Sequence, residues 1–213
     1  GGLSLGFTQE GFVTSLANDI QDCCVDTYAH NHPETPRDHI VLGDIKDVVK
    51  NLDELLSGRN IDIVVGGPPC QGFSMANRQR LIDDPRNYLY KSYVEVVKKV
   101  HPKFFVMENV KGMLSVAEQV KEDFRAIGYS VECHILNAKN FGVPQNRERL
   151  IYIGNCLGVD NEQIFNEIFV LSENIPEHNL EDALFALREL EASRVKNSTE
   201  SGSIESGYKI EKK

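Results

Sequence analysis

The sequence predicts an α/β protein built on a doubly wound, mostly parallel sheet of the Rossmann type. Short apolar runs rich in β-branched residues alternate with longer segments in which apolar side chains recur at helical spacing. This alternation is typical of strand–helix–strand units, in which helices cover both faces of a buried parallel sheet. Polar or reactive side chains follow four of the expected strands, at Asp19, Asp44, Cys70 and Glu108. Ligands of such sheets bind at the carboxyl ends of the strands, so function is expected at this edge.

The first part of the chain supplies two expected strand–helix units and the strand of a third. Gly1 and Gly2 look like the end of a glycine-rich turn that enters a helix, and Asp22 can cap the helix that follows the first strand. Gly58 suits the end of the next helix, because glycine accepts the left-handed backbone that often terminates helices. The expected strands are 12–17, 40–42 and 61–65, and the expected helices are 22–30 and 45–56.

The second part continues the pattern up to residue 153. Pro85 fits the first turn of a helix, and Gly128 stops the helix after it. Beyond Gly154 the pattern weakens, and the spaced leucines of 180–190 indicate one more helix. The expected strands are 103–107, 129–136 and 149–153, and the expected helices are 86–100 and 116–127.

Composition divides the chain into two segments. Residues 1–192 are expected to form a catalytic and cofactor-binding domain. Residues 193–213 are rich in serine and glycine and contain few apolar side chains. Such a composition cannot bury enough surface to fold by itself, so we expect a linker or a disordered segment there.

The overall composition limits the class of protein. Hydrophobic residues make up 41% and charged residues 26%, and no apolar run has the length of a membrane span or the pattern of a secretory signal. Five cysteines without a Cys-x-x-Cys pair favour reduced thiols in a cytoplasm over disulfides or a structural zinc site. The formal net charge of −9 counts against nucleic acid as a partner of this stretch alone. A basic patch must therefore be local or lie elsewhere in the protein.

Cys70 is the candidate nucleophile. It follows the expected strand 61–65 through the sequence Gly66-Gly67-Pro68-Pro69, a rigid turn that an ordinary core cysteine does not need. Cysteines are more often small buried residues, and that interpretation is kept for the other four. A thiolate is a strong nucleophile. Glu108 suits protonation of a substrate, because a nearly buried carboxyl group beside a developing anion retains its proton more readily.

Glycines and acids near the amino terminus suit a cofactor that contains adenosine. Gly1 and Gly2 would let the backbone approach the ligand, and Asp19 can accept hydrogen bonds from ribose hydroxyls. Asp44, one strand further on, can accept a hydrogen bond from the adenine amino group. Each acid alone is more often a helix cap. Their spacing of one strand favours the cofactor.

Two arginines at the start of the last expected strand form a further candidate. Gln145, Arg147 and Arg149 alternate along the chain, so an extended backbone presents one amide and two guanidinium groups on the same face. Guanidinium groups bind phosphates or base edges. A lone Arg-x-Arg is more often a solvated strand face, whereas the whole run from Gly142 to Arg149 is more specific.

Taken in order, these motifs resemble those of the C5-cytosine DNA methyltransferases, which use S-adenosylmethionine. The similarity extends over residues 1–154 and includes the runs Gly43-Asp44-Ile45, Gly67-Pro68-Pro69-Cys70, Glu108-Asn109-Val110 and Val143-Pro144-Gln145. The resemblance implies a methyltransferase-type Rossmann-like fold and no metal. The cofactor contacts that it implies are Gly1, Gly2, Asp19, Ile20, Asp44, Ile45, Pro69 and Leu89, and the catalytic residues are Cys70, Glu108, Asn109, Arg147 and Arg149.

The resemblance also implies a mechanism. A cytosine is flipped out of duplex DNA, and the Cys70 thiolate attacks its C6 atom. Glu108 donates a hydrogen bond or proton at N3, and Asn109 fixes the loop that carries the cysteine. The C5 atom takes the methyl group, which leaves S-adenosylhomocysteine, and a base removes the C5 proton as Cys70 departs. Arg149 would hold the base at O2, and Arg147 a phosphate or the active-site loop.

The sequence departs from the family pattern at both ends. The strand and aromatic residue that usually precede Gly1 are not present, nor is the DNA-reading region that usually follows a run such as 180–184. We therefore expect an incomplete sheet, with weak DNA binding and little activity from these residues alone. The same chemistry on a tRNA cytosine, or a non-catalytic partner that keeps the fold and binds DNA or protein, are the alternatives.

The expected setting is a monomer in a bacterial cytoplasm that acts on double-stranded DNA without a membrane. A restriction–modification system and an orphan enzyme both fit these residues. In a restriction–modification system, a cognate restriction endonuclease would be a partner.

Overall fold

The computed structural model describes residues 1–69 and 88–185 of the chain. Cys70, Pro85 and the tail 193–213 lie outside these residues. The chain forms two compact units. The first comprises Gly1–Leu136 and Glu148–Val170, and the second comprises Asn137–Arg147 and the residues from Leu171 onward. The candidate residues other than Gln145, Arg147 and Cys70 lie in the first unit, within the described part of the chain.

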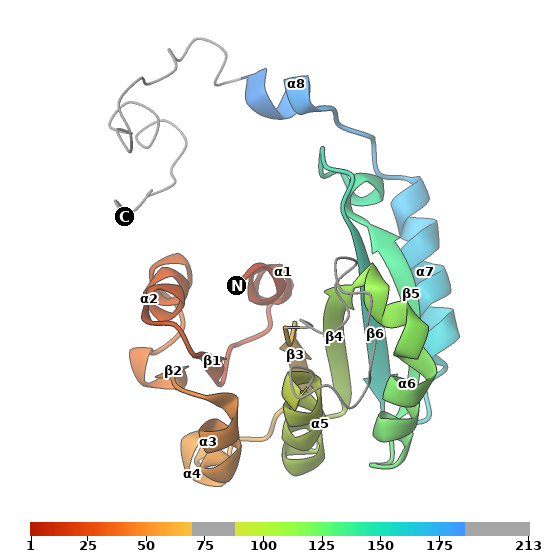
Figure 1. The fold of residues 1–213 in the computed structure, drawn as a ribbon. Helices are drawn as coiled ribbons and strands as arrows, with labels where there is room; N and C mark the ends of the chain where they lie inside the picture. The colour runs from red at the N-terminus through yellow and green to blue at the C-terminus, as the bar shows by residue number, and fades with distance from the viewer. Residues whose placement is uncertain (70–87, 186–213) are drawn as a thin grey trace. The chain divides into compact units, whose positions relative to one another are not determined.

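The first unit contains parallel strands in two sheets (Figure 1). The smaller sheet pairs β1 with β2 in parallel, and the larger sheet has the order β3-β4-β6-β5. β3 and β4 are parallel, whereas β6 runs antiparallel to β4. The strands are β1 (Ala17–Asp19), β2 (Ile40–Leu42), β3 (Ile63–Gly66), β4 (Phe104–Val110), β5 (Ser130–Asn137) and β6 (Glu148–Asn155). The predicted α/β class with a mostly parallel sheet is therefore confirmed.

The antiparallel direction of β6 follows from a short connection. β5 and β6 are neighbours in the sheet and are joined by a brief segment that contains only the 3₁₀ turn η5 (Ala138–Phe141). A parallel neighbour needs a crossover of about a dozen residues or more, usually a helix. The chain therefore turns back after β5, which inserts β6 between β5 and β4.

Helices connect most of the strands. Their bounds agree with expectation at α2 and α5, although the described part of α5 begins only at Tyr88. No helix in the described ranges is both long enough and apolar enough to span a lipid bilayer. The helices are α1 (Gly2–Gln9), α2 (Asp22–Asn31), α3 (Ile45–Lys50), α4 (Leu52–Leu56), α5 (Tyr88–Val100), α6 (Ala117–Arg125), α7 (Asn161–Glu173) and α8 (Leu180–Leu184), with 3₁₀ turns η1 (Arg37–His39) and η4 (Lys111–Val116).

The strand expected at 12–17 is wrong. Only Ala17 of that range lies in a strand, and β1 continues to Asp19. Phe12 instead packs edge-on against Phe7 of α1, with ring centroids 5.3 Å apart, and Val13 is 85% exposed. The apolar residues of this run therefore belong to the end of α1 and a solvent-exposed link rather than to the sheet.

One helix prediction is wrong, and one helix was not predicted. The single helix expected over 45–56 is two helices, because the residue between them, Asn51, is the C-cap of α3 and the N-cap of α4. Ser57 and Gly58 then adopt left-handed backbone angles, which ends α4. Sequence reasoning missed α7, although Ile164, Phe165 and Ile168 recur at helical spacing. The short length of the apolar stripe, between polar residues, hid that pattern.

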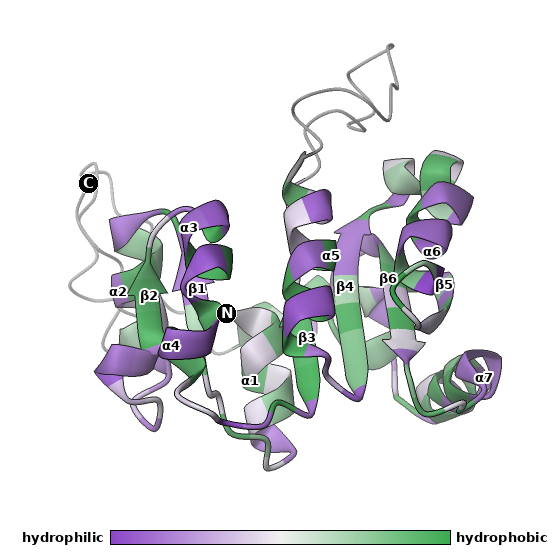
Figure 2. Ribbon diagram, turned by 90° about the horizontal axis from the view of Figure 1, so that it is seen from below, coloured by the Kyte–Doolittle hydropathy of each residue, from purple (hydrophilic) through white to green (hydrophobic). Residues whose placement is uncertain are grey.

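The core of the first unit lies between the larger sheet and the helices α5 and α6. β4 alternates strictly, with Phe105, Met107 and Asn109 buried and the residues between them half-buried. Phe105 stacks on Phe124 of α6 at a centroid distance of 4.0 Å. In Figure 2, β3 is coloured mostly hydrophobic, and α5 carries both hydrophobic and hydrophilic residues. One face of β4 therefore packs, and the other, which carries Glu108, remains partly open.

Tyr93 of α5 ties β3 to β4. Its side chain is almost fully buried, and its hydroxyl lies 3.0 Å from the Val64 carbonyl oxygen and 2.9 Å from that of Val106, so its one proton is shared between the two acceptors. Burial raises the pKa of the Tyr93 phenol well above its ordinary value, so the phenol remains a donor. One side chain thus holds together the two strands that lead to the candidate site.

We expect Tyr93→Phe to lower the free energy of unfolding by about 1–2 kcal/mol, because two buried carbonyl oxygens lose a donor. Tyr28→Phe is the matched control: its half-buried hydroxyl pairs with Thr14 Oγ1 at 3.2 Å, where water can replace it. Urea unfolding measures both. Equal stability of the two variants would contradict the bridging role of Tyr93.

Candidate active site

Asn109 joins the end of β4 to the turn after β3. The register of the parallel pair places Gly66 opposite Met107, so the Gly67-Pro68 turn lies beside the last residues of β4. The buried Asn109 Nδ2 donates to the Pro68 carbonyl oxygen at 3.0 Å, and its Oδ1 accepts from the Val110 backbone N–H at 2.9 Å. Both ends of the amide are thus engaged, which fixes the turn that precedes position 70.

Glu108 forms an ion pair with Arg149. Its Oε1 lies 2.6 Å from Arg149 Nε, and Arg149 Nη1 also donates to the Glu148 carbonyl oxygen at 2.8 Å. In the antiparallel β4–β6 pair, Arg149 lies opposite Val110, so it is a diagonal neighbour of Glu108 on the same face. A second ion pair, Lys111 Nζ to Glu148 Oε2 at 3.0 Å, joins the start of η4, directly after β4, to β6. The site residue that the arginine motif supplies therefore contacts the expected acid.

The surroundings of Glu108 differ from expectation in one respect. Instead of the nearly buried carboxyl group expected at the end of a strand, the Glu108 side chain is 30% exposed. It also lies within β4, which continues to Val110. The ion pair with Arg149 explains how the carboxylate is held without full burial, because the guanidinium replaces part of its hydration.

Arg147 belongs to the second unit. Its backbone N–H donates to Asn137 Oδ1 at 3.1 Å, and its carbonyl oxygen accepts from the Ala138 N–H, which closes the loop before β6. Gln145 N–H turns back to the Val143 carbonyl oxygen at 2.7 Å. The roles expected of Arg147 and Arg149 toward DNA stay predictions.

The two acids expected at the cofactor lie on adjacent turns. The Gly43 N–H donates to the Asp19 carbonyl oxygen at 3.0 Å, and Asn18 Nδ2 donates to the carbonyl oxygens of Val41 and Gly43. The ends of β1 and β2 are thus joined. Asp19 Oδ1 accepts from the Gln21 N–H at 2.9 Å. Asp44 is the N-cap of α3, and its Oδ1 accepts from the Lys46 N–H at 2.8 Å.

These turns fit an adenosine-containing group. Asp19 is exposed at the end of β1, and the adjoining Ile20 is 64% exposed, so an acceptor and an apolar surface lie together. Asp44 also has the capping role that is common for such an acid, and Ile45 beside it is half-buried. Carboxylate acceptors beside an apolar surface are what ribose hydroxyls and an adenine ring require.

The other expected cofactor residues lie at the start of α1, in the first turn of α5 and in the turn after β3. Gly1 is the N-cap of α1, as expected of a turn entering a helix, and a β-carbon built on it would lie 3.0–3.1 Å from atoms of Ser4 and Tyr28. Gly2 begins α1 with no such neighbour. Leu89 is half-buried in the first turn of α5, and Pro69 is exposed. The expected nucleophile, Cys70, lies outside the described residues.

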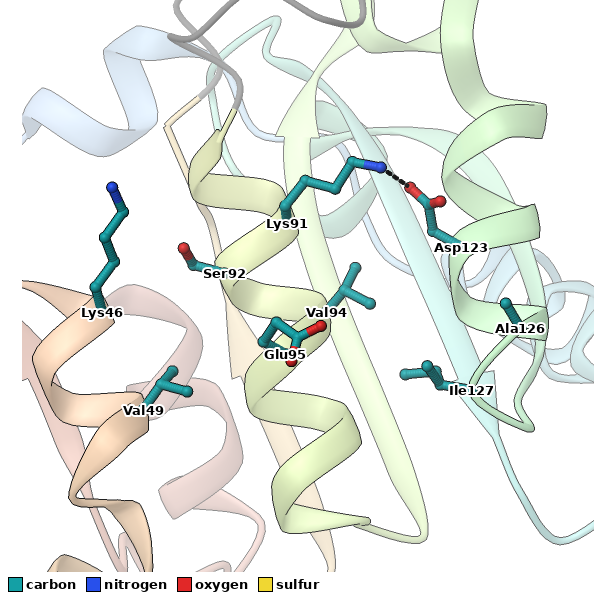
Figure 3. A pocket seen from close by; sticks show the side chains of 9 residues that line it. All are labelled: Lys46, Val49, Lys91, Ser92, Val94, Glu95, Asp123, Ala126 and Ile127. Carbon is teal, nitrogen blue, oxygen red and sulfur yellow. Dashed lines mark hydrogen bonds and ion pairs between the residues drawn. The ribbon is translucent and has the colours of Figure 1, made fainter.

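The pocket drawn in Figure 3 is lined by other residues. It has a volume of about 470 Å³ and opens between α3, α5 and α6, where the ion pair of Lys91 with Asp123 borders apolar side chains such as Val94 and Ile127. None of the candidate site residues lines it. Within residues 1–69 and 88–185, no cluster of three or more His, Cys, Asp or Glu side chains could hold a metal ion.

We expect Asn109→Asp to lower the free energy of unfolding by roughly 2–4 kcal/mol, since the carboxylate cannot donate to Pro68 and is buried beside its carbonyl oxygen. Asn31→Asp is the matched control, because Asn31 Nδ2 also donates to a backbone carbonyl oxygen, that of Thr27, but at an exposed position. Its effect should stay within about 0.5 kcal/mol. Denaturant unfolding tests both, and equal losses would contradict the anchoring of the turn by Asn109.

The chain is similar to known proteins over most of its length. A sequence model of the C-5 cytosine-specific DNA methylase family matches residues 1–212. The type II methyltransferase M1.HphI of Haemophilus parahaemolyticus is 45% identical over 163 residues, which cover 72% of this chain and 43% of that protein. The type II methyltransferase M.AquIA of Picosynechococcus is 38% identical over 174 residues, which cover 74% of this chain and 69% of that protein.

Solved structures show the same fold. A protein described as a DNA modification methyltransferase encoded within an E. coli prophage has a TM-score of 0.72 and 28% identity, and the match covers 89% of this chain and 53% of that one. The Dnmt2 methyltransferase of S. pombe, at 21% identity and a TM-score of 0.61, covers 84% and 52% and shares the fold. The chain spans less than half the length of M1.HphI and about half that of these structures. The chain belongs to the C-5 cytosine-specific DNA methylase family.

Proposed function

We propose that the protein containing this chain is a DNA (cytosine-5-)-methyltransferase. It would transfer a methyl group from S-adenosylmethionine to C5 of a cytosine flipped out of duplex DNA, through a covalent bond between Cys70 and C6. The observation that carries the proposal is the junction of β3 and β4. There Asn109 holds the turn before Cys70 and Arg149 holds Glu108, in a chain that the family model matches over residues 1–212.

Cys70 and Glu108 would share the first step. The thiolate sulfur forms a bond to C6, and the electron pair of the C5–C6 double bond moves into the ring toward N3. Glu108 in its protonated form donates a proton or hydrogen bond at N3, which prevents full negative charge there and leaves a carboxylate paired with Arg149. Oε1 is engaged with Arg149, so Oε2 is the oxygen that would face the base. The charged guanidinium of Arg149 holds the carboxyl group in place while that group acts at N3.

The cofactor residues would orient the methyl donor. When bound, S-adenosylmethionine supplies an electrophilic methyl group. Asp19 would accept hydrogen bonds from the ribose and Asp44 from the adenine amino group, while Ile20 and Ile45 contact the ring. Gly1, Gly2, Pro69 and Leu89 would complete the contacts. After transfer to C5, a base takes the C5 proton, the electrons restore the double bond, and the Cys70 thiolate leaves.

The arginines would position the DNA. Arg149, which already holds Glu108, would also contact the base at O2, and Arg147 a phosphate or the active-site loop. Two guanidinium groups concentrate positive charge in a protein of net charge −9, as a local DNA contact requires. Relatives named type II methyltransferases support a role in restriction–modification. A cognate endonuclease would then be a partner, and the working form would be a monomer in the bacterial cytoplasm.

The domain boundaries are part of the proposal. We assign residues 1–192 to the catalytic domain and 193–213 to the start of a region that reads the DNA sequence.

Cys70→Ser should lower methyl transfer by at least about three orders of magnitude, because a serine hydroxyl is a far weaker nucleophile than a thiolate. Cys156→Ser is the matched control, since that half-buried thiol lies at the edge of the core, near the carbonyl oxygens of Pro102 and Lys103, and is none of the candidate site residues. The assay is transfer of a labelled methyl group by the protein expressed from its complete gene, with duplex DNA and tRNA as separate substrates.

The same experiment separates the alternatives. Unchanged turnover by Cys70→Ser would sink the mechanism, and preferential labelling of tRNA would replace DNA as the substrate. DNA containing 5-fluorocytosine should trap the wild-type protein covalently, because fluorine at C5 cannot leave as a proton does. No adduct and no transfer would favour a non-catalytic binding partner.

Asp19→Ala and Asp44→Ala should each weaken binding of S-adenosylhomocysteine by roughly 10- to 100-fold, the usual value of a hydrogen bond to a charged group. The control is Asp26→Ala, because the exposed Asp26 makes only a 3.7 Å ion pair with Arg37. Calorimetric titration measures all three. Wild-type affinity in both site variants would remove these acids from the cofactor site.

A further inference from the structure

The two glycines at the end of β3 face different neighbours. A β-carbon on Gly66 would lie 2.7 Å from Cε2 of the Tyr93 ring. A β-carbon on Gly67 would lie 2.9 Å from Glu108 Oε2 and 3.6 Å from the Glu108 carbonyl oxygen. Neither glycine has the left-handed backbone that favours glycine. Glycine is therefore suited to these positions because a larger side chain has no space there, and not because the backbone angles require it.

The space beside Gly67 is occupied by the reactive end of Glu108. Arg149 holds Oε1 at 2.6 Å from its Nε, so the carboxylate cannot swing away without lengthening that ion pair. The other oxygen, Oε2, lies directly against Gly67. Gly67 itself is followed by Pro68, whose carbonyl oxygen is held by Asn109. The acid is thus confined between Arg149 on β6 and the backbone of Gly67, directly after β3.

We propose that Gly67 is a positioning residue for Glu108. Without a side chain at position 67, the carboxylate reaches the turn that leads to Cys70 while it remains paired with Arg149. A methyl group at position 67 displaces Oε2 and changes the distance between the acid and the base that it serves. This inference rests on the proposed function, in which Glu108 acts at N3 of the cytosine.

Substitution by alanine should have different consequences at Gly67 and at Gly66. In Gly67→Ala the clash is with the end of a partly exposed side chain, which can move, so the fold is retained and the acid is misplaced. In Gly66→Ala the clash is with the Tyr93 ring, which is buried and held by hydrogen bonds to Val64 and Val106. Gly66→Ala should therefore lower the midpoint of thermal unfolding by several degrees, whereas Gly67→Ala leaves it near the wild-type value.

The test is a double-mutant cycle in the protein expressed from its complete gene. Gly67→Ala should lower kcat roughly 10- to 100-fold, as a misplacement near 1 Å does, with wild-type affinity for S-adenosylhomocysteine. In the Glu108→Asp background, Gly67→Ala should cost less than about threefold. The shorter side chain withdraws its oxygens from position 67, so the two effects are not additive.

Each outcome decides the inference. An equal loss from Gly67→Ala in both backgrounds would mean that the methyl group acts on the turn of Cys70 rather than on Glu108, and would overturn it. A wild-type kcat for Gly67→Ala, or an unfolding midpoint as low as that of Gly66→Ala, would overturn it too. The variant Glu108→Ala separates a failure of the proposed function from a failure of the inference about Gly67. A fully active Glu108→Ala removes the proposed role of the acid itself, whereas an inactive Glu108→Ala beside a fully active Gly67→Ala removes only the role of Gly67.

Discussion

The parallel register between β3 and β4 is the constraint on which the candidate site depends. With Gly66 opposite Met107, the turn that begins at Gly67 must lie beside Glu108 and Asn109. A slip by one residue would turn every side chain of β4 to the opposite face, placing Asn109 in solvent and Glu108 in the core. Tyr93 resists such a slip, because its hydroxyl bonds to a carbonyl oxygen on each strand. The position of the turn beside Glu108 therefore depends on how the Tyr93 phenol packs in the core.

The alternation along β4 separates packing from chemistry within consecutive residues. Phe105, Met107 and Asn109 point into the layer of α5 and α6, and the amide of Asn109 uses this buried position to hold the Pro68 carbonyl oxygen in a setting that excludes water. Glu108 points to the other face, where Arg149 reaches it from β6. Because β6 is antiparallel, its first residues lie beside the last residues of β4. A short turn back after β5 is therefore what delivers the arginine to the acid.

Carboxylates at the cofactor turns combine two duties. Asp44 caps α3 through Oδ1, and Asp19 closes the turn after β1 through Oδ1. Each carboxylate has a second oxygen and further lone pairs, so a backbone contact orients the group without exhausting its capacity to accept hydrogen bonds. Capping and ligand binding are thus compatible interpretations of the same side chain, and a cap positions an acceptor at the edge of the sheet where ligands bind.

The sequence by itself determined the α/β class, most of the elements and the family, because strand and helix periodicities and the Pro-Pro-Cys, Glu-Asn and Arg-x-Arg motifs are local. It could not place β1, since the apolar run at Phe12 is equally suited to packing on α1. Only the tertiary structure decided that Arg149 pairs with Glu108, that Asn109 holds Pro68 and that Gly67 lies against a carboxylate. These contacts join strands far apart in the chain, and register and strand direction, which no local pattern encodes, bring them together.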